Sequence, residues 1–182
     1  TLGNAAKLAG NTHSSQQHYL RALETFRKSG DREGEANSLI NLGEIQRRRG
    51  DLADAERLQR ESLAIHREIG YRRGEAYSLN NLGIIANTRG DLAEAERLQR
   101  ESLAIKREIG DRLGEAASLG KLGIIAQIRG DLAEAERLQR ESLAIKREIG
   151  DRIGEAASLG NLGIIAQTRG DLAEAERLQR ES

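Results

Sequence analysis

Small and apolar residues return at alternating steps of three and four positions through most of the chain, which is the period of an amphipathic helix. One such stripe, between residues 132 and 149, consists of Ala135, Leu138, Ser142, Ile145 and Ile149. Another, between residues 112 and 129, consists of Ala116, Leu119, Gly123 and Ala126. The pattern predicts two helices, Arg112–Arg129 and Leu132–Ile149, with no strand between them.

The breaks between these stripes have the residues of tight helix ends. Gly110 and Gly130 stand where a helix must end in a left-handed residue, a conformation that glycine adopts without steric cost. The aspartates that follow, Asp111 and Asp131, are good N-caps for the next helix. Asp131 and Glu134 also have the spacing of a capping box. We therefore expect each pair of helices to be joined by a short turn.

The whole pattern repeats every 40 residues. The dipeptide Leu-Gly recurs at Leu42, Leu82, Leu122 and Leu162, and the block 91–109 reappears letter for letter as 131–149. A fixed period of this size is typical of a solenoid, because one small unit cannot bury its apolar face alone. We expect a single array over 1–182, with partial units 1–29 and 150–182 around complete units 30–69, 70–109 and 110–149. Since both ends fall inside units, we expect a segment of a larger protein.

Two further features of the units concern packing. Glu136 with Arg140, and Arg137 with Glu141, are four apart on the outer side of the second helix and predict solvent-exposed ion pairs. Gly123 lies inside a predicted helix, where it costs about 1 kcal/mol relative to alanine. Either the paired helix crosses there too closely for a side chain, or the glycine was merely copied during duplication.

Composition narrows the class of protein. Aromatic residues make up 2% of the 182 residues, so the core must come from Leu, Ile and Ala. There is no cysteine, which excludes disulfides and thiolate sites, and the 29 basic and 29 acidic residues cancel. A neutral chain lacks the charge of a nucleic-acid binder. No apolar run approaches the roughly 20 residues that span a bilayer, so we expect no membrane partner and a soluble, cytoplasmic protein.

The two-helix unit, with Leu-Gly in its first helix and Gly-Asp before its second, resembles the tetratricopeptide repeat. The small residue early in each second helix fits as well: Ala55, Ala95, Ala135 and Ala175. The unit is longer than the common repeat of about 34 residues. Its motifs Ser-Leu-x-Asn-Leu-Gly and Gly-Asp-Arg-x-Gly-Glu-Ala are similar to the long repeats of Pins-type polarity adaptors and of bacterial signal-transduction ATPase sensors. The resemblance implies an all-α fold, a right-handed solenoid of stacked antiparallel helix pairs.

The resemblance also implies that the first helices line a concave peptide-binding groove. Carried over position by position, the candidate groove residues are Asn37, Asn41, Arg47, Arg48, Tyr77, Asn80, Asn81, Ile84, Asn87, Lys121, Ile124, Gln127, Asn161 and Ile164. Their early half is polar and partly basic and their late half apolar, which favours a peptide with acidic residues at one end and apolar anchors at the other. In the alternative interpretation, the asparagines only bond neighbouring first helices and the isoleucines only complete packing between repeats.

Other candidate chemistry is weak. Of the three histidines, His13 and His18 are five apart, a poor match to a helical metal pair, and solvated surface histidines are the simpler expectation for them and for His66. The run Arg47–Arg49 suits the negative end of a helix dipole. We find no phosphate loop and no nucleophile with a base, and therefore expect no catalytic residue, metal or cofactor and no enzyme activity.

The function expected is a protein–protein interaction scaffold that binds an extended peptide or partner segment in its groove. The alternative from another class is a structural solenoid that self-associates end to end through uncapped, nearly identical units. A consensus-like engineered array is a third possibility, because the units are so alike.

Overall fold

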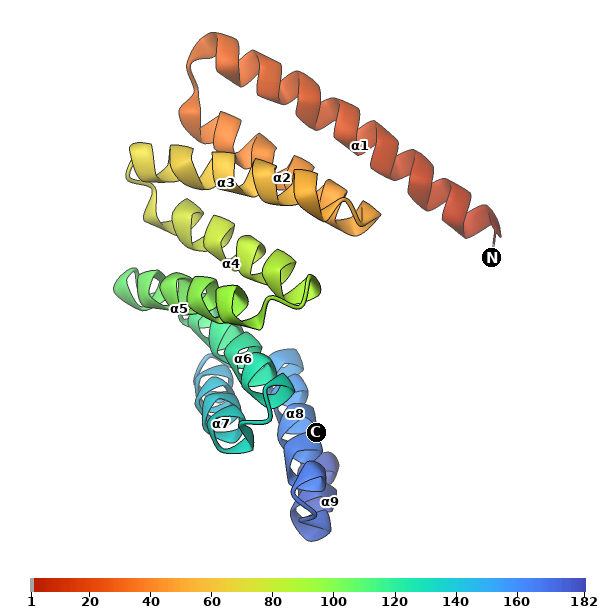
Figure 1. Ribbon diagram of the computed structural model, residues 1–182, viewed down its shortest axis with the longest axis vertical. Coiled ribbons are helices and arrows are strands. Elements are labelled where there is room, and N and C mark those ends of the chain that lie inside the picture. The colour runs from red at the N-terminus through yellow and green to blue at the C-terminus, as the bar shows by residue number, and fades with distance from the viewer. Residues whose placement is uncertain (1) are drawn as a thin grey trace. The chain divides into compact units, whose positions relative to one another are not determined.

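The computed structural model describes the backbone of residues 2–182 and the side chains of residues 14–182, and all regular structure in that range is helical. The helices are α1 Leu2–Ser29, α2 Arg32–Arg49, α3 Leu52–Glu68, α4 Arg72–Thr88, α5 Leu92–Glu108, α6 Arg112–Ile128, α7 Leu132–Glu148, α8 Arg152–Thr168 and α9 Leu172–Glu181 (Figure 1). They form two compact units, residues 1–89 and 90–182, each described by itself.

Within each unit, consecutive helices run in opposite directions and contact each other (Figure 1). The first unit holds α1 to α4 and the second holds α5 to α9. The first helices of the repeats are α2, α4, α6 and α8, and the second helices are α1, α3, α5, α7 and α9. The expected all-α stack of antiparallel helix pairs is confirmed.

The predicted helix ends are confirmed to within one residue in α6 and α7. Gly110 and Gly130 have φ angles of 69° and 82°, the left-handed conformation expected of them. Asp111 and Asp131 accept the N–H groups of Gly114 and Glu134 at 2.9 and 3.0 Å. The Glu134 carboxylate accepts from the side chain of Arg137, at 2.7 Å from Nε and from Nη2, so the capping role falls to Asp131.

Helix α1 departs from the repeat. Residues 1–29 were expected to end a first helix and form a second, yet α1 continues through both over 28 residues. The sequence there has Gly10-Asn11 in place of the Gly-Asp pair, and residues 12–17 replace the regular Leu-Ala-Glu-Ala stretch. At the other turns an N-cap aspartate bonds the start of the next helix, apart from Gly70-Tyr71, where α4 begins without a side-chain cap.

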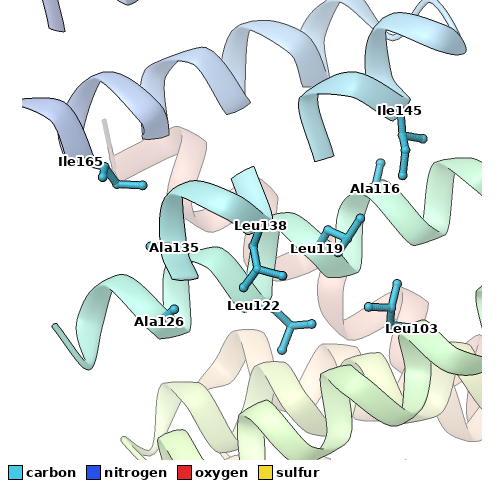
Figure 2. Packing of buried hydrophobic residues seen from close by; sticks show 9 residues of the cluster. All are labelled: Leu103, Ala116, Leu119, Leu122, Ala126, Ala135, Leu138, Ile145 and Ile165. Carbon is cyan, nitrogen blue, oxygen red and sulfur yellow. The ribbon is translucent and has the colours of Figure 1, made fainter. Parts of the chain in front are cut away.

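The core is built from leucine, isoleucine and alanine, as the composition predicts. In the second unit one core cluster includes Leu119 and Leu122 of α6, Leu103 of α5, Leu138 of α7 and Ile165 of α8 (Figure 2). The first unit has an equivalent cluster, formed by Leu23, Ala36, Leu39, Leu42, Leu58 and Ile65. Each helix pair therefore completes its core with the next, which is the physical basis of a stacked repeat.

The glycine inside the first helix makes room for a glutamine of the second. A Cβ on Gly123 would lie 2.8 Å from Nε2 of Gln139, and one on Gly43 would lie 2.7 Å from Nε2 of Gln59. Gln139 Nε2 donates to the Gly120 carbonyl at 2.9 Å, three residues before Gly123. At Gly123 the atoms nearest to such a Cβ belong to the side chain of Gln139, whereas a Cβ on Gly163 would meet nothing closer than 3.8 Å.

Candidate binding surface on the first helices

The first helices of each unit contact one another, α2 with α4 and α6 with α8. Their outward side, here called the first-helix face, carries the predicted groove residues. Its described members come from α2 and α4 in the first unit and from α6 and α8 in the second. The first-helix face therefore consists of two surfaces, one on each unit.

In the first unit this face is polar with one large exposed ring. Asn37 and Arg48 are exposed, and Tyr77 is 54% exposed. The partly buried members are Asn41, Arg47, Asn80, Ile84 and Asn87. Asn81 is only 8% exposed, which corrects the expectation that it lies open in the groove.

Asparagines of this face make hydrogen bonds within their own helix. Asn41 Nδ2 donates to the Asn37 carbonyl of its own helix at 2.8 Å. Asn80 Nδ2 donates to Asn81 Oδ1 at 3.2 Å. The amide oxygen of Asn87 is buried and has no hydrogen-bond partner among the described residues.

The basic end of this face is partly neutralised. Glu44 accepts from Arg47 Nε and Nη2, both at 2.8 Å, and from Arg48 Nε at 2.7 Å. The hydrogen bond from Arg47 is the largest cause that lowers the pKa of Glu44, followed in the same direction by that from Arg48. Arg49 donates to Gln16 at 2.6 Å. Two guanidinium groups thus share one carboxylate, which cancels one of their two positive charges, and Arg49 adds another positive charge beside a neutral glutamine.

In the second unit the face is apolar and open. Large aliphatic residues are exposed at the following fractions: Leu113 59%, Ile124 39%, Ile128 58%, Ile153 87% and Ile164 51%. Ala117, Gly120 and Gly160 lie between them on the same helices, and their lack of bulk leaves the aliphatic side chains uncovered. Lys121, Gln127 and Asn161 are the polar members and are all partly buried or exposed. The stripe is far more accessible than residues that only complete packing.

The sequence alone did not indicate that three lysines of the second unit, Lys106, Lys121 and Lys146, influence one another. Lys106 is 7% exposed, and its Nζ donates to Ser118 Oγ at 2.8 Å. Lys146 Nζ makes the same bond to Ser158 Oγ at 2.8 Å. Burial above all, with repulsion from Lys121 as a second cause, lowers the pKa of Lys106 to about 8. The sequence does show that Lys106 and Lys146 stand at equivalent positions of two repeats, 40 residues apart. The earlier repeats have Phe26 and His66 at this position.

His66 is buried, with 0% of its surface exposed, which corrects the expectation of a solvated histidine. Its Nδ1 lies 3.2 Å from Ser78 Oγ, and its Nε2 has no partner among the described residues. Desolvation lowers the pKa of His66. His18 is exposed, and His13 lies outside the described side chains. No group of three metal-binding side chains occurs in the part of the chain that the structure describes.

The opposite side of the second unit carries two furrows between second helices, of about 700 and 590 Å³. The one between α5 and α7 has Leu103, Leu119, Leu122 and Leu138 among its lining residues, and that between α7 and α9 has their equivalents 40 residues later. Arg107 crosses the first furrow to Glu141 at 2.5 Å. Their lining is nearly the same residue for residue, so neither furrow offers a distinct recognition site.

Among the described residues, no helix is both long and apolar enough to cross a membrane. The family model of the tetratricopeptide repeat matches residues 1–68, 48–108, 74–148 and 114–182, which together span the chain. Among curated proteins, none matches the sequence.

Several solved structures share the fold. BtubC (BKLC) from P. vanneervenii is 21% identical with a TM-score of 0.85, over 99% of this chain and 75% of that one. A Rap protein complexed with Competence and Sporulation Factor is 18% identical with a TM-score of 0.79, over 97% and 49%. The STAND protein PH0952 from Pyrococcus horikoshii, with a tetratricopeptide repeat sensor, is 18% identical with a TM-score of 0.78, over 93% and 28%.

Proposed function

Because the chain belongs to the tetratricopeptide repeat family, whose members are generally protein-interaction scaffolds, we propose that it binds an extended segment of a partner protein along its first-helix face. The observation that carries the proposal is the open aliphatic stripe of α6 and α8. Isolated exposed aliphatic residues are ordinary, whereas a stripe on two contacting helices is typical of an interaction surface.

Polar groups near the stripe suit a peptide main chain. An asparagine amide offers both a donor and an acceptor, so it can pair with peptide groups whatever the side chains of the ligand. In the first unit Asn37 is exposed, and in the second unit Asn161 is partly exposed. The Rap protein of similar fold was solved with a bound factor, which supports partner binding by this architecture.

The described residues provide little support for an enzymatic function. Among the described residues, His66 lies beside the hydroxyls of Ser62 and Ser78, an arrangement that resembles a base beside a nucleophile. All three residues are 0% exposed, so no substrate reaches them. Family members are generally not enzymes. A binding function therefore accounts better for the exposed residues.

The test is a peptide-display selection on the whole chain, followed by affinity measurements on the best ligand. The variant Ile164→Asp places a charge in the aliphatic stripe and should weaken binding about tenfold or more, since the ligand's apolar anchor then desolvates a carboxylate. The matched control is Leu172→Asp, which changes an aliphatic residue of comparable exposure (62% against 51%) on the second helix α9.

The expected result is a loss in Ile164→Asp with less than a twofold change in Leu172→Asp. Equal losses in both would place the ligand elsewhere. Failure to select any peptide, combined with concentration-dependent polymerisation in light scattering, would favour the structural alternative.

A further inference from the structure

Two departures from the repeat meet where α3 turns into α4, at residues 66–78, here called the α3–α4 joint. The later repeats have a lysine near the end of the second helix and an aspartate five residues on. These pairs are Lys106 with Asp111 and Lys146 with Asp151. The α3–α4 joint has His66 and Tyr71 at the same two positions. Their rings contact each other edge to face, with centroids 5.5 Å apart.

The aspartate of the later repeats has two roles. Asp111 accepts the N–H of Gly114 at 2.9 Å and so caps α6. Its charge also opposes the burial that lowers the pKa of Lys106. Asp151 acts in the same two ways before α8. Tyr71 takes neither role, because its side chain makes no capping hydrogen bond to α4 and a phenol carries no charge near neutral pH.

His66 is enclosed in the α3–α4 joint. It is 0% exposed, and it packs so closely against Gly74 that a side chain there would clash with the ring. Its Nδ1 lies 3.2 Å from Ser78 Oγ and 3.4 Å from Ser62 Oγ. Its Nε2 has no partner among the described residues. A second proton on this ring would therefore create a charge in a space that water does not reach.

The charged groups that act on His66 come from two neighbouring helices. Burial lowers the pKa of His66, whereas the carboxylates of Glu33 on α2 and Glu75 on α4 act in the opposite direction. Glu75 is already held by Arg67 at 2.8 Å and by Arg72. Burial prevails, so the ring binds a proton more readily when the joint is open. Acid below about pH 6.5 should then favour the open joint.

We propose that the α3–α4 joint is an acid-sensitive switch, in which protonation of His66 separates it from Tyr71 and unwinds the first turns of α4. In the later repeats a buried cation stays in place because an aspartate balances it and also caps the helix. The charged imidazole has no such carboxylate at position 71, so it gains free energy by moving into water. Tyr77 lies in the second turn of α4, so opening would also displace the exposed ring of the first-helix face.

The experiment measures hydrogen exchange of the whole chain at pH 7.5 and pH 5.0, corrected for the intrinsic pH dependence of exchange. Protection of residues 72–78 should fall about tenfold at pH 5.0, because each pH unit below the pKa of the open state shifts the opening equilibrium by up to about tenfold. Residues 112–118 should change less than about twofold. Lys106, with a pKa of about 8, stays largely protonated at both pH values.

Tyr71→Asp installs the residue of the later repeats and should reduce the fall to about threefold or less, because the carboxylate caps α4 and balances the protonated ring. The matched control is Tyr77→Asp, which makes the same substitution at a 54% exposed position of the same helix and should leave the tenfold fall unchanged. His66→Phe, with the residue that Phe26 places at the equivalent position, should abolish the fall.

Nuclear magnetic resonance of the His66 ring gives an independent readout. The ring should titrate below pH 6.5 in the unmodified chain and at a higher pH in Tyr71→Asp. An imidazole that titrates at or above pH 6.5 would overturn the switch, as would protection at the start of α4 that is equal at both pH values. An undiminished fall in Tyr71→Asp would also overturn it. Each of these results is obtained without a ligand and is independent of the proposed binding function.

Discussion

At the residue scale, one column of the repeat shows how a single side chain changes the chemistry of a shared fold. Phe26, His66, Lys106 and Lys146 stand at equivalent positions near the end of a second helix. Gly74 faces His66 so closely that a Cβ there would lie 2.5 Å from the ring. Because glycine has no side chain, it leaves a space at this position that accommodates an aromatic ring, an imidazole or the aliphatic part of a lysine.

His66 should make stability depend on pH between neutral and mildly acidic conditions. Burial lowers its folded-state pKa below the usual 6.5, and this outweighs the opposing influence of the Glu33 and Glu75 carboxylates. The unfolded chain therefore binds the proton more readily, and stability should fall as the pH drops below about 6.5. Urea denaturation at pH 7.5 and pH 5.0 should show this loss, and His66→Phe should reduce it.

The control for this prediction is His18→Gln, which changes an exposed histidine of the same unit. The carboxylates with lowered pKa, such as Glu44, act in a separate window below about 4.5. An unchanged loss in His66→Phe between pH 7.5 and pH 5.0 would assign the pH dependence to other groups.

At the scale of the helix pair, the same glycine plays different parts in neighbouring repeats. A Cβ on Gly123 would crowd Gln139, which is 0% exposed and holds the Gly120 carbonyl. A Cβ on Gly163 would meet only ordinary contacts, the nearest at 3.8 Å. The intrinsic gain of alanine over glycine in a helix is the same at both sites, so packing decides the outcome.

Gly163→Ala should stabilise the protein by about 0.5–1 kcal/mol, because nothing opposes the helix propensity. Gly123→Ala should destabilise it by about 1 kcal/mol. The Gln139 side chain would have to move away, and the Gly120 carbonyl would lose its hydrogen bond in a site that water does not reach. Chemical denaturation of the two variants measures both values. A stabilised Gly123→Ala would mean that the glutamine relocates freely and that the glycine is only an inherited copy.

At the scale of the molecule, each described helix contacts mainly the helices next to it within its unit. Ion pairs join consecutive helices, as when Arg147 of α7 reaches Glu155 of α8 at 2.8 Å, and also successive second helices, as when Arg107 of α5 reaches Glu141 of α7 at 2.5 Å. Stability in such a stack is close to a sum of repeat terms and nearest-neighbour terms. A local change should therefore have a local effect.

Leu119→Ala removes a core side chain that is 1% exposed and should destabilise the second unit by about 2–4 kcal/mol. Hydrogen exchange followed by mass spectrometry should speed up in α5 to α8, where the surrounding core lies, far more than in α2 and α3. Equal acceleration in all helices would show that the chain unfolds as one cooperative block.

The 40-residue pattern alone determined the helices, their ends and their antiparallel pairing. These are local properties, because the helical period of apolar residues and the Gly-Asp turns act within about twenty residues of sequence. The same repeat motifs indicated the tetratricopeptide repeat family, whose model matches the chain. In α1 the absence of the Gly-Asp signal was visible too, although only the structure showed that the helix continues.

The tertiary structure decided which polar residues are buried and which charges are balanced. Asn81 and His66 look like surface residues in the sequence, and neighbouring helices cover both. Arg47 and Arg48 look like free charges, and Glu44 pairs with both and cancels one of the two, while no ion pair involves Lys121 among the described residues. Burial and ion pairing depend on distances between helices, which no repeat pattern specifies, so the candidate site could be located from the sequence but not its electrostatics.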